Sequence, residues 1–128
     1  MTNKYVLDAS AILAFLKDEI GADVVALALP NSVISTVNLS EVCSKLIDYG
    51  LPHDEIAQVL AEFVPIIQPF DLNQALKAGH LRAMARRKGL SLGDRACLAL
   101  AGTTGRIALT ADRIWSELDL DISIELIR

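Results

Sequence analysis

Short apolar runs alternate along this chain with longer segments in which apolar residues recur every three or four positions. The short runs predict five β-strands, at residues 4–8, 32–35, 66–69, 106–109 and 122–127. The helical spacing predicts seven helices, at residues 9–17, 22–29, 38–49, 53–63, 71–88, 91–101 and 113–118. Because strands that alternate with helices favour a parallel sheet covered on both faces, we expect an α/β fold. Its architecture would be a three-layer α/β/α sandwich with a mostly parallel five-stranded sheet.

The chain has 128 residues, of which 52% are hydrophobic and 22% are charged. This composition excludes disordered and fibrous classes, and the length suits a single domain over residues 1–128. The longest uncharged stretch, residues 24–40, contains Pro30 and is shorter than the roughly 20 apolar residues of a membrane span. With no apolar signal-peptide core and two cysteines in apolar helical patterns, we expect a cytoplasmic protein without a membrane segment.

Charge is unevenly distributed along the sequence. The whole chain has a formal net charge of −4, but residues 82–106 contain six basic side chains and only one acidic side chain. Four of these basic residues are close together: Arg82, Arg86, Arg87 and Lys88. They are candidates for contacts to an anionic ligand. Equally, the last three would complement the dipole at the C-terminal end of a helix that stops before Gly89.

Four acidic residues follow expected strands or begin the helices after them: Asp8, Glu41, Asp94 and Asp112. In open α/β sheets ligands bind beyond the carboxyl ends of the strands, so these four side chains should converge on one rim. Like charges a few ångströms apart repel one another, and such a group needs a bound cation or raised pKa values. Oxygen ligands of this kind suit Mg²⁺ or Mn²⁺.

Three acids in the chain have a simple capping interpretation. Asp8 and Asp112 each precede an expected helix and are suited to cap its first turn. Asp71 begins the helix expected at 71–88, with Gln74 three residues later, and we interpret Asp71 as a cap only. Position alone therefore leaves capping and chemistry open for Asp8 and Asp112.

The other two acids fit the capping-box pattern, in Asn38-x-x-Glu41 and, more loosely, in Ser91-x-x-Asp94. Glu41 is also placed to pair with Lys45, four residues later on the same helix. A purely structural role is hardest to accept for Asp94, because positions 97, 98 and 101 on its helical face are apolar. A carboxylate along such a face is costly unless it is paired or bound to metal.

Together these acids form a recognisable pattern. The sequence resembles the PIN-domain nucleases, and among them the VapC toxins, in four elements: Asp8-x-Ser10, Glu41 in N-L-S-E-V, Asp94 in S-L-G-D-R-A, and Thr110-x-Asp112. The similarity covers essentially the whole chain, and no acidic position of the pattern is missing. The resemblance implies a Rossmann-like PIN sheet and an endoribonuclease that depends on Mg²⁺ or Mn²⁺.

The resemblance also assigns roles to the residues of the pattern. The implied catalytic residues are the four acids, Asp8, Glu41, Asp94 and Asp112, of which Asp8, Asp94 and Asp112 would bind the metal directly. Glu41 would bind metal through water or orient the attacking water. The hydroxyls of Ser10 and Thr110 would hold carboxylates in place. Candidate contacts to the RNA backbone are Arg82, Arg86, Arg87 and Lys88.

VapC toxins form homodimers and are neutralised by a VapB antitoxin, so the resemblance implies both partners for this chain. DNA binding in such pairs belongs to the antitoxin, and we expect no direct DNA binding here. The early helices are rich in apolar side chains that could form an interface: Ile12, Leu13, Phe15, Leu16, Val24, Val25, Leu27 and Leu29. Ordinary core packing remains an equal alternative for these residues.

Other functions fit the sequence less well. Nucleotide-binding loops are absent, and an aspartate phosphatase of the haloacid-dehalogenase class would need D-x-D where this chain has Ser10. A phospho-receiver signalling module would need a lysine after a late strand, but the last lysine is Lys88. A non-catalytic PIN scaffold remains the other alternative, although the full set of acids disfavours it.

Overall fold

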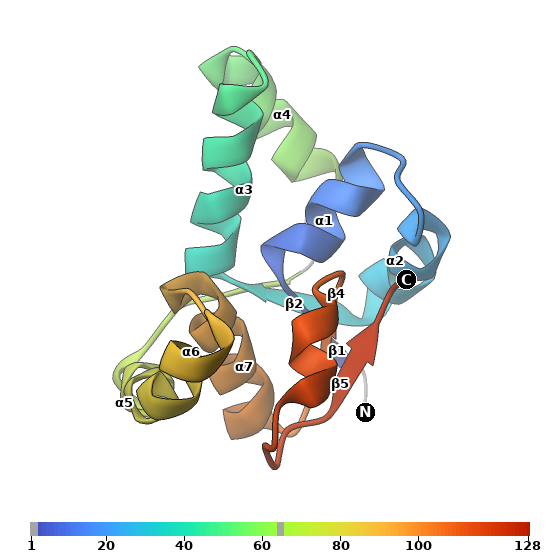
Figure 1. Ribbon diagram of the computed structural model, residues 1–128. Helices are drawn as coiled ribbons and strands as arrows, with labels where there is room; N and C mark the ends of the chain where they lie inside the picture. Colours follow the sequence, from blue (N-terminus) through green and yellow to red (C-terminus); the bar gives the residue numbers. More distant parts are fainter. Residues whose placement is uncertain (1–2, 64–65) are drawn as a thin grey trace.

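The computed structural model describes residues 3–63 and 66–128 and contains one five-stranded sheet (Figure 1). Its strands are β1 (Tyr5–Leu7), β2 (Ser32–Ser35), β3 (Ile66–Gln68), β4 (Ile107–Thr110) and β5 (Ile124–Leu126). The strand order is β3-β2-β1-β4-β5, and every neighbouring pair is parallel. The predicted α/β fold is confirmed, and the sheet is wholly rather than mostly parallel.

Helices cover both faces of this sheet. One core is formed with α1 (Ala9–Leu16), α2 (Ala22–Ala28), α3 (Thr36–Asp48) and α4 (His53–Phe63). The other is formed with α6 (Arg82–Lys88) and α7 (Leu92–Thr104), and α5 (Leu72–His80) packs against α7. Two 3₁₀-helices, η1 (Leu29–Asn31) and η2 (Arg113–Glu117), complete the elements. Among the described residues, no helix combines the length and apolar character needed to cross a bilayer.

The two cores meet the sheet through alternate residues of the same strands. Leu7 and Leu109 face the core beneath α1 and α3, whereas Val6 and Ala108 face the core beneath α7. This is expected because successive side chains of a strand point to opposite faces. All four side chains are at most 1% exposed. The central strands are therefore buried on both faces. This packing holds the carboxyl ends of β1 and β4 side by side at one edge of the sheet.

The structure differs from the sequence prediction in one long helix. The helix expected at 71–88 is two helices, α5 and α6, that meet at Leu81. Leu81 is buried in the core beneath α7, and its ψ angle of −2° takes the chain out of the α5 helical path. Gly79, a poor helix former, precedes the break by two residues. The basic residues of the 82–106 segment consequently begin on a separate helix, α6.

Near the predicted metal site, two further helices differ from the sequence prediction. The helix expected at 38–49 begins two residues earlier, because the Ser35 side chain accepts a hydrogen bond from Val37 N and caps α3. Asn38 therefore lies inside the helix, and the capping box predicted for Asn38 and Glu41 is wrong. The helix expected at 113–118 is the 3₁₀-helix η2.

Candidate metal centre

Four carboxylates line one cavity of about 220 Å³ at the carboxyl edge of the sheet. Asp8 follows β1 and Asp112 follows the neighbouring strand β4, while Glu41 comes from α3 and Asp94 from the first turn of α7. The remaining lining residues are Ala9, Ser10, Leu13 and Lys45. The structure thus brings together the four acids that the sequence places at strand ends and helix starts.

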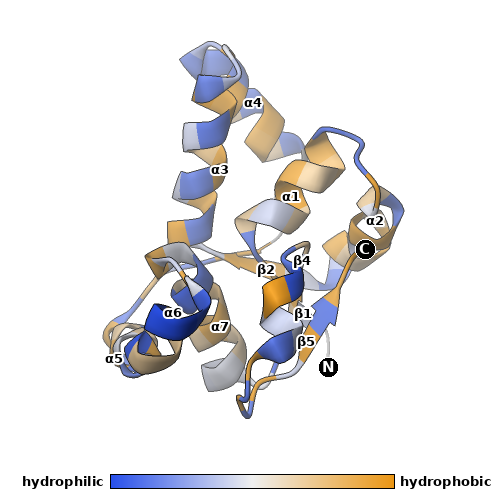
Figure 2. Cartoon of the chain, viewed as in Figure 1, coloured by the Kyte–Doolittle hydropathy of each residue, from blue (hydrophilic) through white to orange (hydrophobic). Residues whose placement is uncertain are grey.

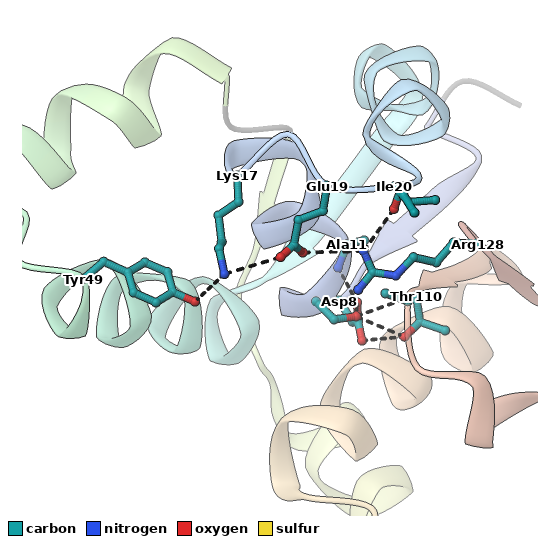
Figure 3. A network of polar contacts seen from close by, with 10 residues as sticks. Asp8, Ala11, Lys17, Glu19, Ile20, Tyr49, Thr110 and Arg128 are labelled. Carbon is teal, nitrogen blue, oxygen red and sulfur yellow. Dashed lines mark hydrogen bonds and ion pairs between the residues drawn. The ribbon is translucent and has the colours of Figure 1, made fainter.

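Asp8 is the most buried of these acids, with 4% of its surface exposed. Its carboxylate accepts three hydrogen bonds: Oδ1 from Ser10 Oγ at 2.7 Å and from Ala11 N at 2.9 Å, and Oδ2 from Thr110 Oγ1 at 2.7 Å (Figure 3). The bond from Ala11 N makes Asp8 the cap of α1, so the capping interpretation is also correct. Burial raises the pKa of Asp8 to about 6 despite these three bonds, and the charge of Asp94 adds to the rise.

The hydroxyls of Ser10 and Thr110 are themselves oriented by backbone groups. Ser10 Oγ accepts from Ala111 N at 3.0 Å, and Thr110 Oγ1 accepts from Asp112 N at 3.0 Å. Because each hydroxyl has a single hydrogen, these bonds leave that hydrogen for the Asp8 carboxylate. Residues at the end of β4 thereby hold the carboxylate at the end of β1. This geometry is the one expected for two hydroxyls that position a ligand carboxylate.

Glu41 is half-buried and held by its own helix. Its Oε1 accepts from Asn38 Nδ2 at 2.9 Å, and the same Nδ2 donates to Gly93 O on α7 at 3.0 Å. Burial raises the pKa of Glu41, and the nearby charge of Asp94 adds to the rise. The sequence reasoning missed Asn38 as a supporting residue. The signal was its position four residues before the buried Val42, which puts a polar side chain on the buried face of α3.

Asp94 and Asp112 each cap a helix and line the cavity at the same time. Asp94 forms the predicted capping box, since its Oδ2 accepts from Ser91 N at 2.9 Å while Ser91 Oγ accepts from Asp94 N at 3.1 Å. Asp112 Oδ1 accepts from Ile114 N at the start of η2. In the described part of the chain, the second carboxylate oxygen of each acid has no hydrogen-bond donor. Burial raises the pKa of Asp94, as does the charge of Asp112.

No described ion pair neutralises this group of acids. The ion pairs among residues 3–63 and 66–128 join Lys17 to Glu19, Lys88 to Glu117 and Arg128 to Glu19. The predicted pair between Glu41 and Lys45 is not formed, although Lys45 supplies the one basic side chain in the cavity lining. Burial is the main cause of the raised pKa values of Asp8, Glu41 and Asp94, and no described ion pair offsets it.

The donor set fits a hard divalent cation held partly through water. Carboxylate oxygens suit Mg²⁺ and Mn²⁺, and Mg²⁺ keeps several water ligands while it binds one or two carboxylates. Within the described residues, no three His, Cys, Asp or Glu side chains lie close enough to form a ready-made metal site. Direct ligation by a subset of the acids, with water bridging to the others, agrees with both observations.

The predicted basic residues lie on α6, which Figure 2 shows as a strongly hydrophilic helix. Arg82, Arg86 and Arg87 are exposed, while Lys88 is half-buried and its Nζ lies 3.5 Å from Glu117 Oε1 on η2. Gly89 ends α6 in the left-handed conformation, so the last three basic residues do complement a helix C-terminus. Only Gly89, Leu90 and Ser91 separate α6 from α7, whose first turn carries Asp94.

Comparison with known families identifies the architecture. The family model for the PIN domain matches residues 5–120, a segment that contains all four cavity acids. The chain belongs to the PIN domain family. The predicted resemblance to PIN domains is therefore confirmed.

Solved structures of this fold agree with the assignment. A chain of DNA-bound VapBC from Salmonella typhimurium is 23% identical, with a TM-score of 0.77 and full coverage of both chains. A chain of VapBC2 from Rickettsia felis, bound to a promoter DNA fragment, is 16% identical with a TM-score of 0.73, covering 95% of this chain and 97% of that one. VapBC-5 from Mycobacterium tuberculosis, of the VapBC family of toxin-antitoxin systems, is 22% identical with a TM-score of 0.61 and 98% coverage of each. Among curated proteins, no sequence matches.

Proposed function

We propose that this PIN domain, a single domain over residues 1–128, is a metal-dependent endoribonuclease and the VapC-type toxin of a toxin–antitoxin pair. One observation carries the proposal: four carboxylates that have no ion-pair partner among the described residues line one cavity, and three of them have raised pKa values. A structural role needs no such accumulation of like charge, whereas a bound divalent cation removes its cost.

The proposed roles follow from the geometry of the cavity. Asp8, Asp94 and Asp112 would hold Mg²⁺ or Mn²⁺, and Ser10 and Thr110 fix the Asp8 carboxylate through the bonds described above. Bound there, such an ion lowers the pKa of water and stabilises charge on a phosphodiester. Glu41, half-buried in the lining of the same cavity, would accept a proton from the attacking water or orient it.

A cleavage assay tests this proposal directly. The purified chain is incubated with a panel of RNAs in Mg²⁺, in Mn²⁺ and in EDTA, beside the Asp8→Ala variant. We expect metal-dependent cleavage that leaves 5′-phosphate and 3′-hydroxyl ends and that Asp8→Ala abolishes. Asp71→Ala is the matched control, because Asp71 caps α5 by accepting from Gln74 N and does not line the cavity. Equal cleavage by the parent chain and Asp8→Ala would refute the proposed site, and no cleavage with no metal binding would favour the non-catalytic scaffold.

We also propose that Arg82, Arg86, Arg87 and Lys88 contact the RNA backbone. Two observations support this proposal. Three of the four side chains are exposed on α6, and only a short connection joins α6 to the first turn of α7, which carries Asp94. Changing both Arg86 and Arg87 to Ala should make the negative slope of log affinity against log salt shallower by about 1.4 for single-stranded RNA. Lys4→Ala is the control, since Lys4 precedes β1 and lies at the opposite edge of the sheet. An unchanged slope would leave these arginines with their helix-terminal role alone.

The proposed partners are a VapB-type antitoxin and a second copy of the chain. Of the eight early-helix residues predicted as an interface, Ile12 and Val25 are buried, whereas Val24 and Leu27 on α2 are 38% and 83% exposed. The other four are partly buried against the first core. Ordinary packing therefore accounts for most of the apolar surplus, and the exposed part remains available to a partner. Light scattering of the chain alone and with a co-expressed antitoxin tests both partners, and we expect no DNA binding without the antitoxin.

A further inference from the structure

The glycine at the start of α7 has an ordinary helical backbone. Gly93 is the second residue of α7, and it is not among the glycines with a positive φ angle in the described chain. Any residue type can adopt this backbone conformation, and alanine is a better helix former by up to about 1 kcal/mol. Something other than backbone freedom must therefore favour glycine at this position.

Space explains the glycine. A Cβ atom placed on Gly93 would overlap with the carboxylate of Glu41, meeting both of its oxygens and Cδ. Glu41 comes from α3, so the missing side chain makes room for a carboxylate from a different helix. Real Cβ contacts are never so close, and with any larger residue the flexible end of Glu41 would have to move.

Asn38 holds the same carboxylate from within α3. Asn38 is 1% exposed, and its Nδ2 donates both to Glu41 Oε1 and to Gly93 O. Both partners are acceptors, so only the amide nitrogen can face them and the orientation of the side chain is fixed. The opposite atom, Oδ1, has no hydrogen-bond partner within the described chain. A buried amide that leaves one atom unpaired is specialised for the two bonds that its nitrogen makes.

We infer that Asn38 and Gly93 are positioning residues that together hold the Glu41 carboxylate at the cavity. Asn38 binds Oε1, Gly93 leaves the space in which the carboxylate lies, and Oε2 has no partner in the described chain and is available for a bound water. The bond from Asn38 opposes the repulsion that the nearby Asp94 exerts on Glu41. This inference rests on the proposed nuclease function, because that function gives the Glu41 carboxylate its task.

A thermal double-mutant cycle on the metal-free protein tests the geometry independently of cleavage. Gly93→Ala is introduced into the parent chain and into Glu41→Ala, and melting temperatures are measured in EDTA. In the parent, the new Cβ displaces the carboxylate and breaks its bond to Asn38. In Glu41→Ala that loss is impossible, and only the better helix propensity remains. We expect the change in Tm to be about 3–5 °C more favourable in Glu41→Ala than in the parent.

Gly79→Ala supplies the matched control, since Gly79 lies within α5 and a Cβ there would meet nothing within 4 Å. Its effect on Tm should be the same in both backgrounds. Equal effects of Gly93→Ala in the two backgrounds would overturn the inference. A parent chain that cleaves no RNA would contradict the proposed function but leave the outcome of this thermal cycle interpretable.

Kinetics then separate positioning from a merely structural role. Gly93→Ala and Asn38→Leu should each lower kcat by about 10- to 100-fold with KM for RNA unchanged, the range typical of residues that support a metal site. Neither substitution should lower activity further in the Glu41→Ala background. If Asn38→Leu fails to fold, Gly93→Ala carries the test alone. A kcat equal to that of the parent in Gly93→Ala would refute the inference.

Discussion

Two groups of charged residues lie at the two ends of α1, and they are built in opposite ways. Figure 3 shows the first group, around Glu19, and Asp8 from the second. In the first, Glu19 joins two basic residues: its Oε2 lies 3.4 Å from Lys17 Nζ, and its Oε1 lies 3.5 Å from Arg128 Nη1. Lys17 also donates to the Tyr49 hydroxyl at 3.3 Å, which is the main reason that the pKa of Lys17 is raised. In this Glu19 network one acid is paired with two bases, and the three side chains are 34–43% exposed.

In the second group, the cavity of Asp8, Glu41, Asp94 and Asp112, every acid has the same charge. The neighbours of these acids are mostly neutral donors such as hydroxyls, backbone N–H groups and the Asn38 amide. The rise in the pKa of Asp8 from 3.8 to about 6 corresponds to roughly 3 kcal/mol against the ionised form.

The difference between the two groups helps to separate the charged residues needed for activity from those that only contribute to folding. Exposed, paired charges contribute little to stability and are easily replaced, with a typical value of 0–1 kcal/mol. Buried, unpaired charges of one sign destabilise the empty fold, and they persist where a ligand compensates them. The comparison therefore predicts that the cavity acids matter for activity far more than for folding, and that the Glu19 network matters little for either.

The largest effect is expected from Asp94→Asn. Asparagine can still accept the bond from Ser91 N, so the capping box of α7 loses little, but a neutral amide is a weak ligand for a divalent cation. RNA cleavage should fall by more than about 100-fold, beyond the range for supporting residues. Circular dichroism and thermal unfolding should stay close to the parent. Cleavage at the parent rate would remove Asp94 from the mechanism and weaken the contrast between the two groups.

A pH series on the metal-free protein tests the cost of the cavity charge. Between pH 3.8 and about 6 the unfolded chain has lost the Asp8 proton while the folded chain keeps it, so stability falls as pH rises through this window. The loss should reach about 3 kcal/mol above pH 6, and the raised pKa values of Glu41 and Asp94 act in the same direction. Urea unfolding in EDTA at several pH values measures this loss in the free energy of unfolding.

Asp8→Asn is the control for that series, because it removes the titrating group and should flatten the pH dependence. Added Mg²⁺ or Mn²⁺ should restore the stability of the parent chain above pH 6 and leave Asp8→Asn unaffected. The same change in stability from pH 4 to pH 6 in the parent and in Asp8→Asn would contradict the pKa assigned to Asp8.

A smaller effect is expected from Thr110→Val, which removes one of the hydroxyls that hold Asp8. Thr110 is fully buried, and its loss also leaves Asp112 N without its acceptor. Mn²⁺ affinity and cleavage should each fall by about 10- to 100-fold. Thr104→Val is the matched control, because the Thr104 hydroxyl donates to Leu100 O within its own helix α7 and does not line the cavity. Equal metal affinity in Thr110→Val and the parent would show that Asp8 needs no hydroxyl from β4.

The sequence predicts well where the cavity acids lie in the fold, because their positions depend on local signals. Asp8 and Asp112 follow apolar runs, and Asp94 begins a helix whose start is marked by Ser91. Parallel strands end at a common edge, so reading each strand end separately already brings these carboxylates together. The same reasoning predicts the three-layer fold, since the alternation of strands and helices is itself local information.

The family resemblance predicts the support that Ser10 and Thr110 give to Asp8, but the sequence does not predict the contact between α3 and α7, because it joins residues far apart in the chain. Asn38 and Gly93 are 55 positions apart, and only the packing of α3 against α7 brings them into contact. The division of the 71–88 segment into α5 and α6 likewise depends on the burial of Leu81. The Glu19 network has the longest separation, with 109 positions between Glu19 and Arg128, and nothing in the local sequence marks either residue.

The smallest effect is expected from Glu19→Gln, which removes the central charge of that network. Both of its ion-pair distances exceed 3.3 Å, and Arg128 keeps its bond to Ile20 O at 3.0 Å, so the C-terminal end stays attached to the loop after α1. Stability should change by less than about 1 kcal/mol and the difference should shrink further in 0.5 M salt, because exposed pairs are weak and screened. Cleavage should be unchanged, since the Glu19 carboxylate does not line the cavity. A large loss of cleavage in Glu19→Gln would mean that α1 transmits strain from this network to Asp8 at its other end, and the two groups would then be one functional unit.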